Sequence, residues 1–180
     1  MRTEDMALSQ IEVIGEGLDG MHAMLDRAVP DMTAEQWNAR PAGDGVSAFF
    51  SLWHYVRTED NIVNWVVHRR PTVWLNGEWD QHFGLHRTSQ GTGMTKEEAD
   101  AVQLNDVDAW LTYQQGVWVV TREWVSTLTE SDLSEEIVIR PTPPMSIWQA
   151  LTGMLLYHGF RHVGEVEHAR GLLGLGGLTI

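Results

Sequence analysis

The sequence predicts an all-α protein built as a four-helix bundle. Four long segments carry apolar residues at spacings of three and four, which is the period of one helix face. Proline or glycine follows three of these segments and would end the helices there. Hydrophobic residues make up 43% of the 180 residues, which suits a folded chain with one sizeable core. We therefore expect residues 1–180 to form a single four-helix-bundle domain.

The first two main helices are predicted before residue 70. The first runs from about Glu4 to Val29 and ends at Pro30. The second runs from about Ser47 to His68 and is closed by Pro71. Its apolar residues form two rows, so most of this helix should be buried. The rows consist of Phe49, Trp53, Val56, Val63 and Val67, and of Phe50, His54, Asn61 and Trp65.

A long tryptophan-rich insert, residues 70–93, separates the second and third main helices. We expect it to be irregular, and irregular segments of this length in compact domains are more often functional than idle. A capping box at Thr95–Glu98 predicts a short extra helix after the insert. The connection is long enough for the third helix to be reached by a crossover.

The last two main helices are predicted in the second half of the chain. The third runs from about Asp106 to Leu128. A connector follows, in which residues 137–139 could be extended and three prolines exclude helix. A second capping box at Ser146–Gln149 opens the fourth helix, which should reach about Leu173 before the glycines that begin at Gly174.

The charge and the missing cysteines exclude several classes of function. The chain has 25 acidic and 12 basic residues, a net charge of -13. Such a surface repels nucleic acid and anionic membranes, and we expect neither as a partner. No targeting or transmembrane segment is recognisable, so the cytoplasm is the expected location. The absence of cysteine excludes a cysteine nucleophile and zinc–thiolate clusters, so any thiol must arrive with a substrate or cosubstrate.

His158 and His162 are the strongest candidate site residues in the fourth helix. They lie four residues apart and therefore on one helix face, one turn from each other. The same face carries Leu151, Leu155, Glu165 and Ala169, so the two rings should point inward. Two imidazoles in a core need partners, which a bound metal would supply. A hydrogen-bonded pair of core histidines is the alternative.

His54 in the second helix could complete a three-histidine site with this pair. Three neutral nitrogens with an open fourth position are typical of a catalytic metal site, not of a closed structural one. Water at that position would have a lowered pKa. Imidazole suits zinc, nickel, copper and iron, so the pattern leaves the identity of the metal open.

Acidic and basic residues near these histidines have more than one interpretation. Glu165 could accept a hydrogen bond from a ring N–H, act as the catalytic general base, or be a solvated carboxylate. Glu59 and Asp60 are weaker candidates for the same roles. Arg57 could hold an anionic substrate or pair with a carboxylate. His22 is expected at the surface or at a boundary.

Two segments around the histidines resemble the signatures of the DinB-like superfamily. They are Leu52–Arg57, which contains His54, and His158–Val166, in which His162 precedes the run Val-Gly-Glu-Val. The resemblance implies a four-helix bundle whose three histidines bind a divalent ion, commonly zinc or nickel. It also implies frequent homodimers. Related members include mycothiol-dependent maleylpyruvate isomerases and bacillithiol or mycothiol transferases, in which the metal activates the thiol of a cosubstrate.

Three functions remain in competition at this point. The first is a metal-dependent enzyme that acts on a small molecule and activates a bound low-molecular-weight thiol or water, as in a thiol transferase or isomerase. The second is a metal-dependent hydrolase with Glu165 as base. The third is a non-enzymatic, stress-related bundle that binds a small apolar ligand, with the insert as its lid. The insert at residues 70–93 departs from the family pattern and leaves the substrate open.

Overall fold

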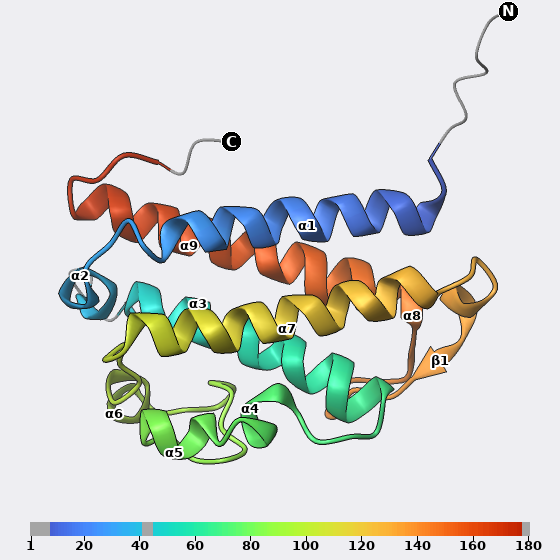
Figure 1. The fold of residues 1–180 in the computed structure, drawn as a ribbon, viewed down its shortest axis with the longest axis horizontal. Helices are drawn as coiled ribbons and strands as arrows, with labels where there is room; N and C mark the ends of the chain where they lie inside the picture. Colours follow the sequence, from blue (N-terminus) through green and yellow to red (C-terminus); the bar gives the residue numbers. More distant parts are fainter. Residues whose placement is uncertain (1–7, 41–44, 178–180) are drawn as a thin grey trace, which may run out of the picture.

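The computed structural model describes residues 8–40 and 45–177, and in this part of the chain four long helical segments form a bundle (Figure 1). This confirms the all-α class and the bundle architecture. Residues 4–7, where the first helix was expected to begin, lie outside the described residues. The four segments are α1 (Gln10–Ala28), α3 with the π-helix η1 (Ala48–Asp60 and Asn61–Val67), α7 (Val107–Thr127), and α8, η3 and α9 in succession (Ile147–Gln149, Ala150–Tyr157 and His158–Leu172).

The helices are arranged so that α1 and α3 occupy opposite corners of the bundle. Both α7 and α9 pack against α1, and both also pack against α3. In Figure 1, α7 begins at the same end of the bundle as α3, so these two helices run parallel. The expected crossover between the second and third main helices is therefore present. None of the described helices has the length and apolar character needed to cross a membrane.

Capping interactions fix the starts of the helices as the sequence predicts. The side chain of Thr95 and that of Glu98 cap each other's backbone N–H groups at the start of α6 (Lys96–Asp100). Ser146 and Gln149 form the same box before α8. Asp106 accepts from the backbone N–H of Ala109 at the start of α7. Each cap satisfies N–H groups that have no partner within their own helix.

The insert is more ordered than expected. It contains α4 (Val73–Asn76) and α5 (Trp79–Phe83), so the prediction of an irregular segment is wrong for these residues. The fully buried carboxylate of Asp60 in α3 accepts hydrogen bonds from the backbone N–H groups of Val73 and Trp74, at 2.9 and 3.0 Å. These bonds anchor the insert to the helix that carries His54.

Smaller elements complete the fold. The helix α2 (Ala34–Asn38) follows α1, and the 3₁₀-helix η2 (Asp132–Ser134) follows α7. The strands β1 (Glu136–Ile137) and β2 (Met145–Ser146) pair antiparallel. The expected extended segment at residues 137–139 is therefore a strand only at Ile137.

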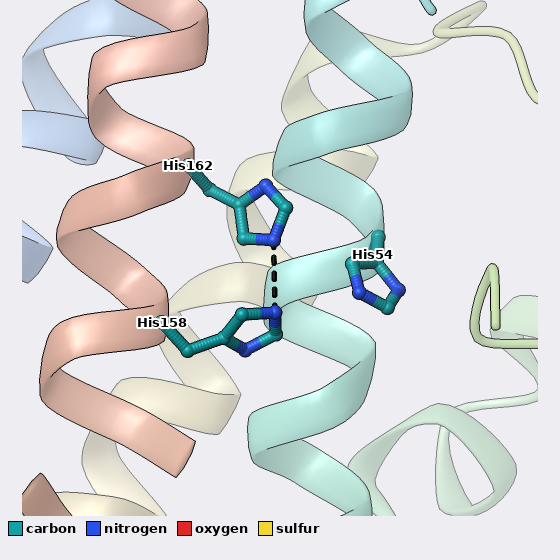
Figure 2. A group of neighbouring side chains, drawn as sticks. All are labelled: His54, His158 and His162. Atoms are coloured by element: carbon teal, nitrogen blue, oxygen red, sulfur yellow. Dashed lines mark hydrogen bonds between the residues drawn. The ribbon is translucent and has the colours of Figure 1, made fainter. Parts of the chain in front are cut away.

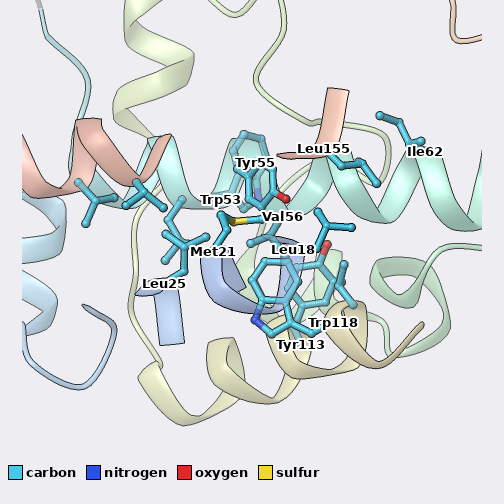
Figure 3. Packing of buried hydrophobic residues seen from close by; sticks show 14 of the residues in the cluster. Leu18, Met21, Leu25, Trp53, Tyr55, Val56, Ile62, Tyr113, Trp118 and Leu155 are labelled. Atoms are coloured by element: carbon cyan, nitrogen blue, oxygen red, sulfur yellow. The ribbon is translucent and has the colours of Figure 1, made fainter. Parts of the chain in front are cut away.

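Aromatic side chains form much of the core between the helices (Figure 3). Leu18, Met21 and Leu25 of α1 pack with Tyr55 of α3 and Trp118 of α7. Five tryptophans are almost completely excluded from solvent: Trp37, Trp53, Trp74, Trp110 and Trp118. Trp65 was predicted in a buried row of the second helix, but 59% of its surface is exposed.

His22 is a core residue, so its expected place at the surface or at a boundary is wrong. Its ring stacks on Trp118 at 3.7 Å, and its Nε2 lies 3.0 Å from the carboxylate of Glu59. Glu59 is fully buried and also accepts hydrogen bonds from the hydroxyls of Tyr55 and Thr121, both at 2.5 Å. The carboxylate gives the buried Nε2 a hydrogen-bond partner, which offsets part of the cost of burying a polar ring.

Candidate metal centre

The three predicted histidines meet in the core between α3 and α9 (Figure 2). The ring centroids of His158 and His162 are 4.5 Å apart, and His54 lies 5.3 and 5.1 Å from them. One ring nitrogen of each histidine lies within 4.8 Å of those of the other two. His162 is buried, and the other two rings are half-buried. The structure therefore brings together all three residues that were expected to bind a metal.

Gly159 allows the close helix packing that brings these rings together. It lies between the two α9 histidines in the sequence and faces α1 and α3. A Cβ atom added at Gly159 would lie 2.8 Å from the Sδ and Cε atoms of Met21 and 2.9 Å from Cζ of Tyr55. Because Tyr55 is itself fully buried, it has little room to give way.

We expect Gly159→Ala to reduce the free energy of unfolding by about 1–3 kcal/mol, because it overpacks the core. Urea denaturation would measure this. Gly164→Ala on the same helix is the matched control, since a Cβ there meets nothing within 4 Å. The control should be neutral or stabilising by up to about 1 kcal/mol. Equal stability of the two variants would contradict the packing argument.

Hydrogen bonds that the Nδ1 atoms of two histidines donate leave the Nε2 atom of each of these rings as an acceptor. Nδ1 of His162 donates to Oε2 of Glu165 at 2.8 Å, and Nδ1 of His54 donates to the carbonyl oxygen of Gln90. These acceptors assign the tautomers and leave the Nε2 lone pairs unprotonated. The Nε2 atoms of His162 and His158 lie 2.9 Å apart and form a hydrogen bond (Figure 2), so the alternative of a hydrogen-bonded histidine pair is present as well. Nδ1 of His158 is buried without a hydrogen-bond partner in the described structure. This donor set fits a cation placed between the rings.

The pKa shifts favour the neutral rings that metal binding requires. Burial, together with the neighbouring rings of His162 and His54, lowers the pKa of His158 to about 3. Burial also lowers the pKa of His54, against the opposing effect of the Gln90 carbonyl. Protons therefore compete little with a metal for these two rings near neutral pH.

Glu165 is held as an anion beside His162. Its Oε2 also accepts a hydrogen bond from the hydroxyl of Ser51, at 2.6 Å. The hydrogen bond from His162 and that from Ser51 lower the pKa of Glu165 to about 2, more than its partial burial raises it. A carboxylate with so low a pKa is a weak general base near neutral pH. Its contacts favour the role of orienting His162.

We expect Glu165→Gln to weaken metal binding about tenfold or more, as loss of a partner that orients a ligand typically does. Titration with a divalent metal would measure this, with the exposed Glu123→Gln of α7 as control. Any metal-dependent activity of the variant should return to the wild-type rate at saturating metal. A rate loss that persists when the site is fully loaded would instead support Glu165 as the catalytic base.

The insert supplies part of the site, which the sequence did not reveal. Gly91 has a φ of 97°, and a Cβ atom there would lie 2.7 Å from Nδ1 of His54. This close approach lets the preceding carbonyl, that of Gln90, reach the ring. The carbonyl of Ser89 accepts from Nε of Arg57 at 3.1 Å, which holds the same loop. The length of the insert indicated a function, but only the two glycines at positions 91 and 93 indicated where its backbone could approach another group closely.

Arg57 pairs with a carboxylate, one of the two roles expected for it. Its Nη1 lies 3.2 Å from Asp60, and its guanidinium stacks over Trp74 at 4.7 Å from the ring centroid. Both charged groups are almost fully buried. Asp60 therefore anchors the insert, and Glu59 accepts hydrogen bonds from other buried side chains in the core.

A cavity of about 900 Å³ opens beside the histidines. His54 and His158 both lie in its wall, together with residues of η1, the insert and residues 138–142. This volume is within the usual range for small-molecule sites. A ligand in the cavity would therefore have access to the three-histidine group.

The fold and the histidine group define a helical bundle of a known kind. The model of the DinB superfamily matches residues 18–166, most of the sequence. The chain belongs to the DinB superfamily. A conserved protein from Enterococcus faecalis has a crystal structure that matches this one with a TM-score of 0.81, at 23% sequence identity, over 93% of this chain and 99% of that chain. At this identity the likeness shows the fold. The comparison with curated proteins gave no match.

Proposed function

We propose that the protein is a metal-dependent enzyme in which His54, His158 and His162 hold one divalent ion. The observation that supports this most strongly is the convergence of the three rings beside a cavity large enough for a substrate. Two of the rings are oriented through their Nδ1 atoms, by Glu165 and by the Gln90 carbonyl. Zinc or nickel is the proposed metal, since both are commonly bound by imidazole.

The proposed reaction begins with a low-molecular-weight thiol that enters the cavity. A bound ion with an open coordination position would lower the pKa of such a thiol, or of water. The chain has no cysteine, which is compatible with a thiol brought by a cosubstrate. The protein's own residues would orient the ligand rings and partly shield the thiol from solvent. A homodimer, which the family resemblance implies, and a cytoplasmic location are part of the same proposal.

Cobalt-loaded protein tests this proposal directly. Titration with N-acetylcysteine should produce a thiolate-to-cobalt absorption band that saturates at about one thiol per chain, because one coordination position is open. The S-methyl derivative of the same compound should produce no such band. A wild-type protein that binds cobalt but shows no band would argue against thiol activation. Equal turnover of thiol with an electrophile after chelation would do the same.

A non-enzymatic function is the second candidate, because part of the cavity wall is apolar. Ile62, Val66, Leu75 and Met154 all lie in it. In this case the protein would bind a small apolar ligand equally well with and without metal. Ligand titration of loaded and chelated protein separates this function from the first.

A further inference from the structure

The cavity beside the histidines concentrates positive charge in an acidic protein. Four arginines lie in its wall: Arg57, Arg69, Arg87 and Arg140. The whole chain has 12 basic and 25 acidic residues, yet no aspartate or glutamate within residues 8–40 and 45–177 lines this cavity. A low-dielectric cleft lined by one sign of charge attracts the opposite charge.

The four arginines differ in whether their charge is already neutralised. Arg57 is bound to Asp60. Arg87 is 72% exposed and lies 3.8 Å from Asp80. Arg69 and Arg140 are exposed and have no hydrogen bond or ion pair within the described part of the chain. Two guanidinium groups are therefore available to a ligand.

The backbone at Arg69 gives an independent reason to examine this residue. Its φ is 53°, in the left-handed region that favours glycine. It follows the end of η1, where the bonds from the N–H groups of His68 and Arg70 to the carbonyls of Val63 and Asn64 already close the helix. The cap does not use the Arg69 side chain, so the fold alone does not explain why an arginine occupies this position.

We infer that Arg69 and Arg140 bind the anionic group, a carboxylate or a phosphate, of a small-molecule substrate. The planar guanidinium matches both groups with paired hydrogen bonds. The apolar part of the substrate would lie against Ile62, Trp65, Val66 and Leu75 in the same wall. This inference rests on the proposed function, because the bound anion is a substrate only if the protein is an enzyme. His54 and His158 lie in the wall of the same cavity.

Two fluorescent probes of similar shape test the inference. One is the anion 8-anilinonaphthalene-1-sulfonate, and the other is the neutral N-phenyl-1-naphthylamine. In metal-free protein, the double variant Arg69→Gln, Arg140→Gln should bind the anionic probe with about tenfold lower affinity, since two charged contacts are lost. Binding of the neutral probe should stay within about twofold. The matched control is Arg27→Gln on α1, an exposed arginine outside the cavity wall.

The outcomes separate this inference from the proposed function. Equal weakening of both probes, no weakening, or an equal effect of the control would overturn it. Loss of the anion preference on chelating the metal from wild-type protein would also overturn it, because the metal would then be the binding group. Displacement of the bound anionic probe by succinate or by inorganic phosphate, with succinamide as the neutral comparison, identifies which group the arginines accept. If the wild-type protein bound no metal, the proposed function would be wrong, but the result with the two probes would still stand.

Discussion

Replacing His158 by alanine is expected to remove about one divalent ion per chain from the purified protein. The ring is one of three that converge in the core, and its Nε2 lies 2.9 Å from Nε2 of His162. Without it, only two imidazole ligands remain for the ion. We expect the affinity for zinc to fall by more than about 100-fold, the upper range for loss of a partner that only orients a ligand. Elemental analysis and a competitive chelator would measure the loss.

His168→Ala is the control for this experiment. His168 lies on the same helix, α9, and is exposed. Both variants remove one imidazole, so a general effect of histidine loss would appear in both. If wild-type protein carried no metal and bound none on titration, the three histidines would not form a metal site. Retention of the ion by His158→Ala would exclude His158 as a ligand.

The second large effect is expected from Gly91→Ala in the insert. The new Cβ would clash with Nδ1 of His54, at 2.7 Å, and would displace either the ring or the loop. Either movement breaks the hydrogen bond from His54 to the Gln90 carbonyl. We expect zinc affinity to fall by about 10–100-fold, as for other losses of a ligand-orienting contact.

Gly93→Ala separates this clash from the backbone strain of alanine at positive φ. Gly93 has a φ of 77°, and a Cβ there meets nothing within 4 Å. Both variants should lose about 1–2 kcal/mol of stability from the left-handed backbone, but only Gly91→Ala should lose metal. Isothermal titration calorimetry and urea denaturation would measure the two effects. If both variants bound zinc as tightly as wild type, the Gln90 loop would have no role in the site.

Local patterns determined the long helices of the fold and the starts of several helices. Capping boxes at Thr95 and Ser146 depend on residues three apart, so the sequence reveals them directly. The spacing of four between His158 and His162 determines that both rings lie on one face of α9. These predictions succeed because helix geometry is set within a few residues of chain.

Contacts between distant segments are what the tertiary structure decided. The ring of His54 is oriented by Gln90, 36 residues away, and His22 is buried by Glu59, 37 residues away. No helical period encodes such a pair, because the distance depends on how the helices pack and on the path of the insert.

The sequence by itself thus determined the bundle class and two rings on one helix face. That the third ring joins them rests on the packing of α3 against α9, which Gly159 permits. The cavity, with two arginines that have no partner among the described residues, likewise exists only in the folded chain. Its wall is drawn from four separate segments: α3 with η1, the insert, residues 138–142 and the last helical segment. The physical reason is the same in each case, because periodicity reports which face is apolar and only packing decides what that face meets.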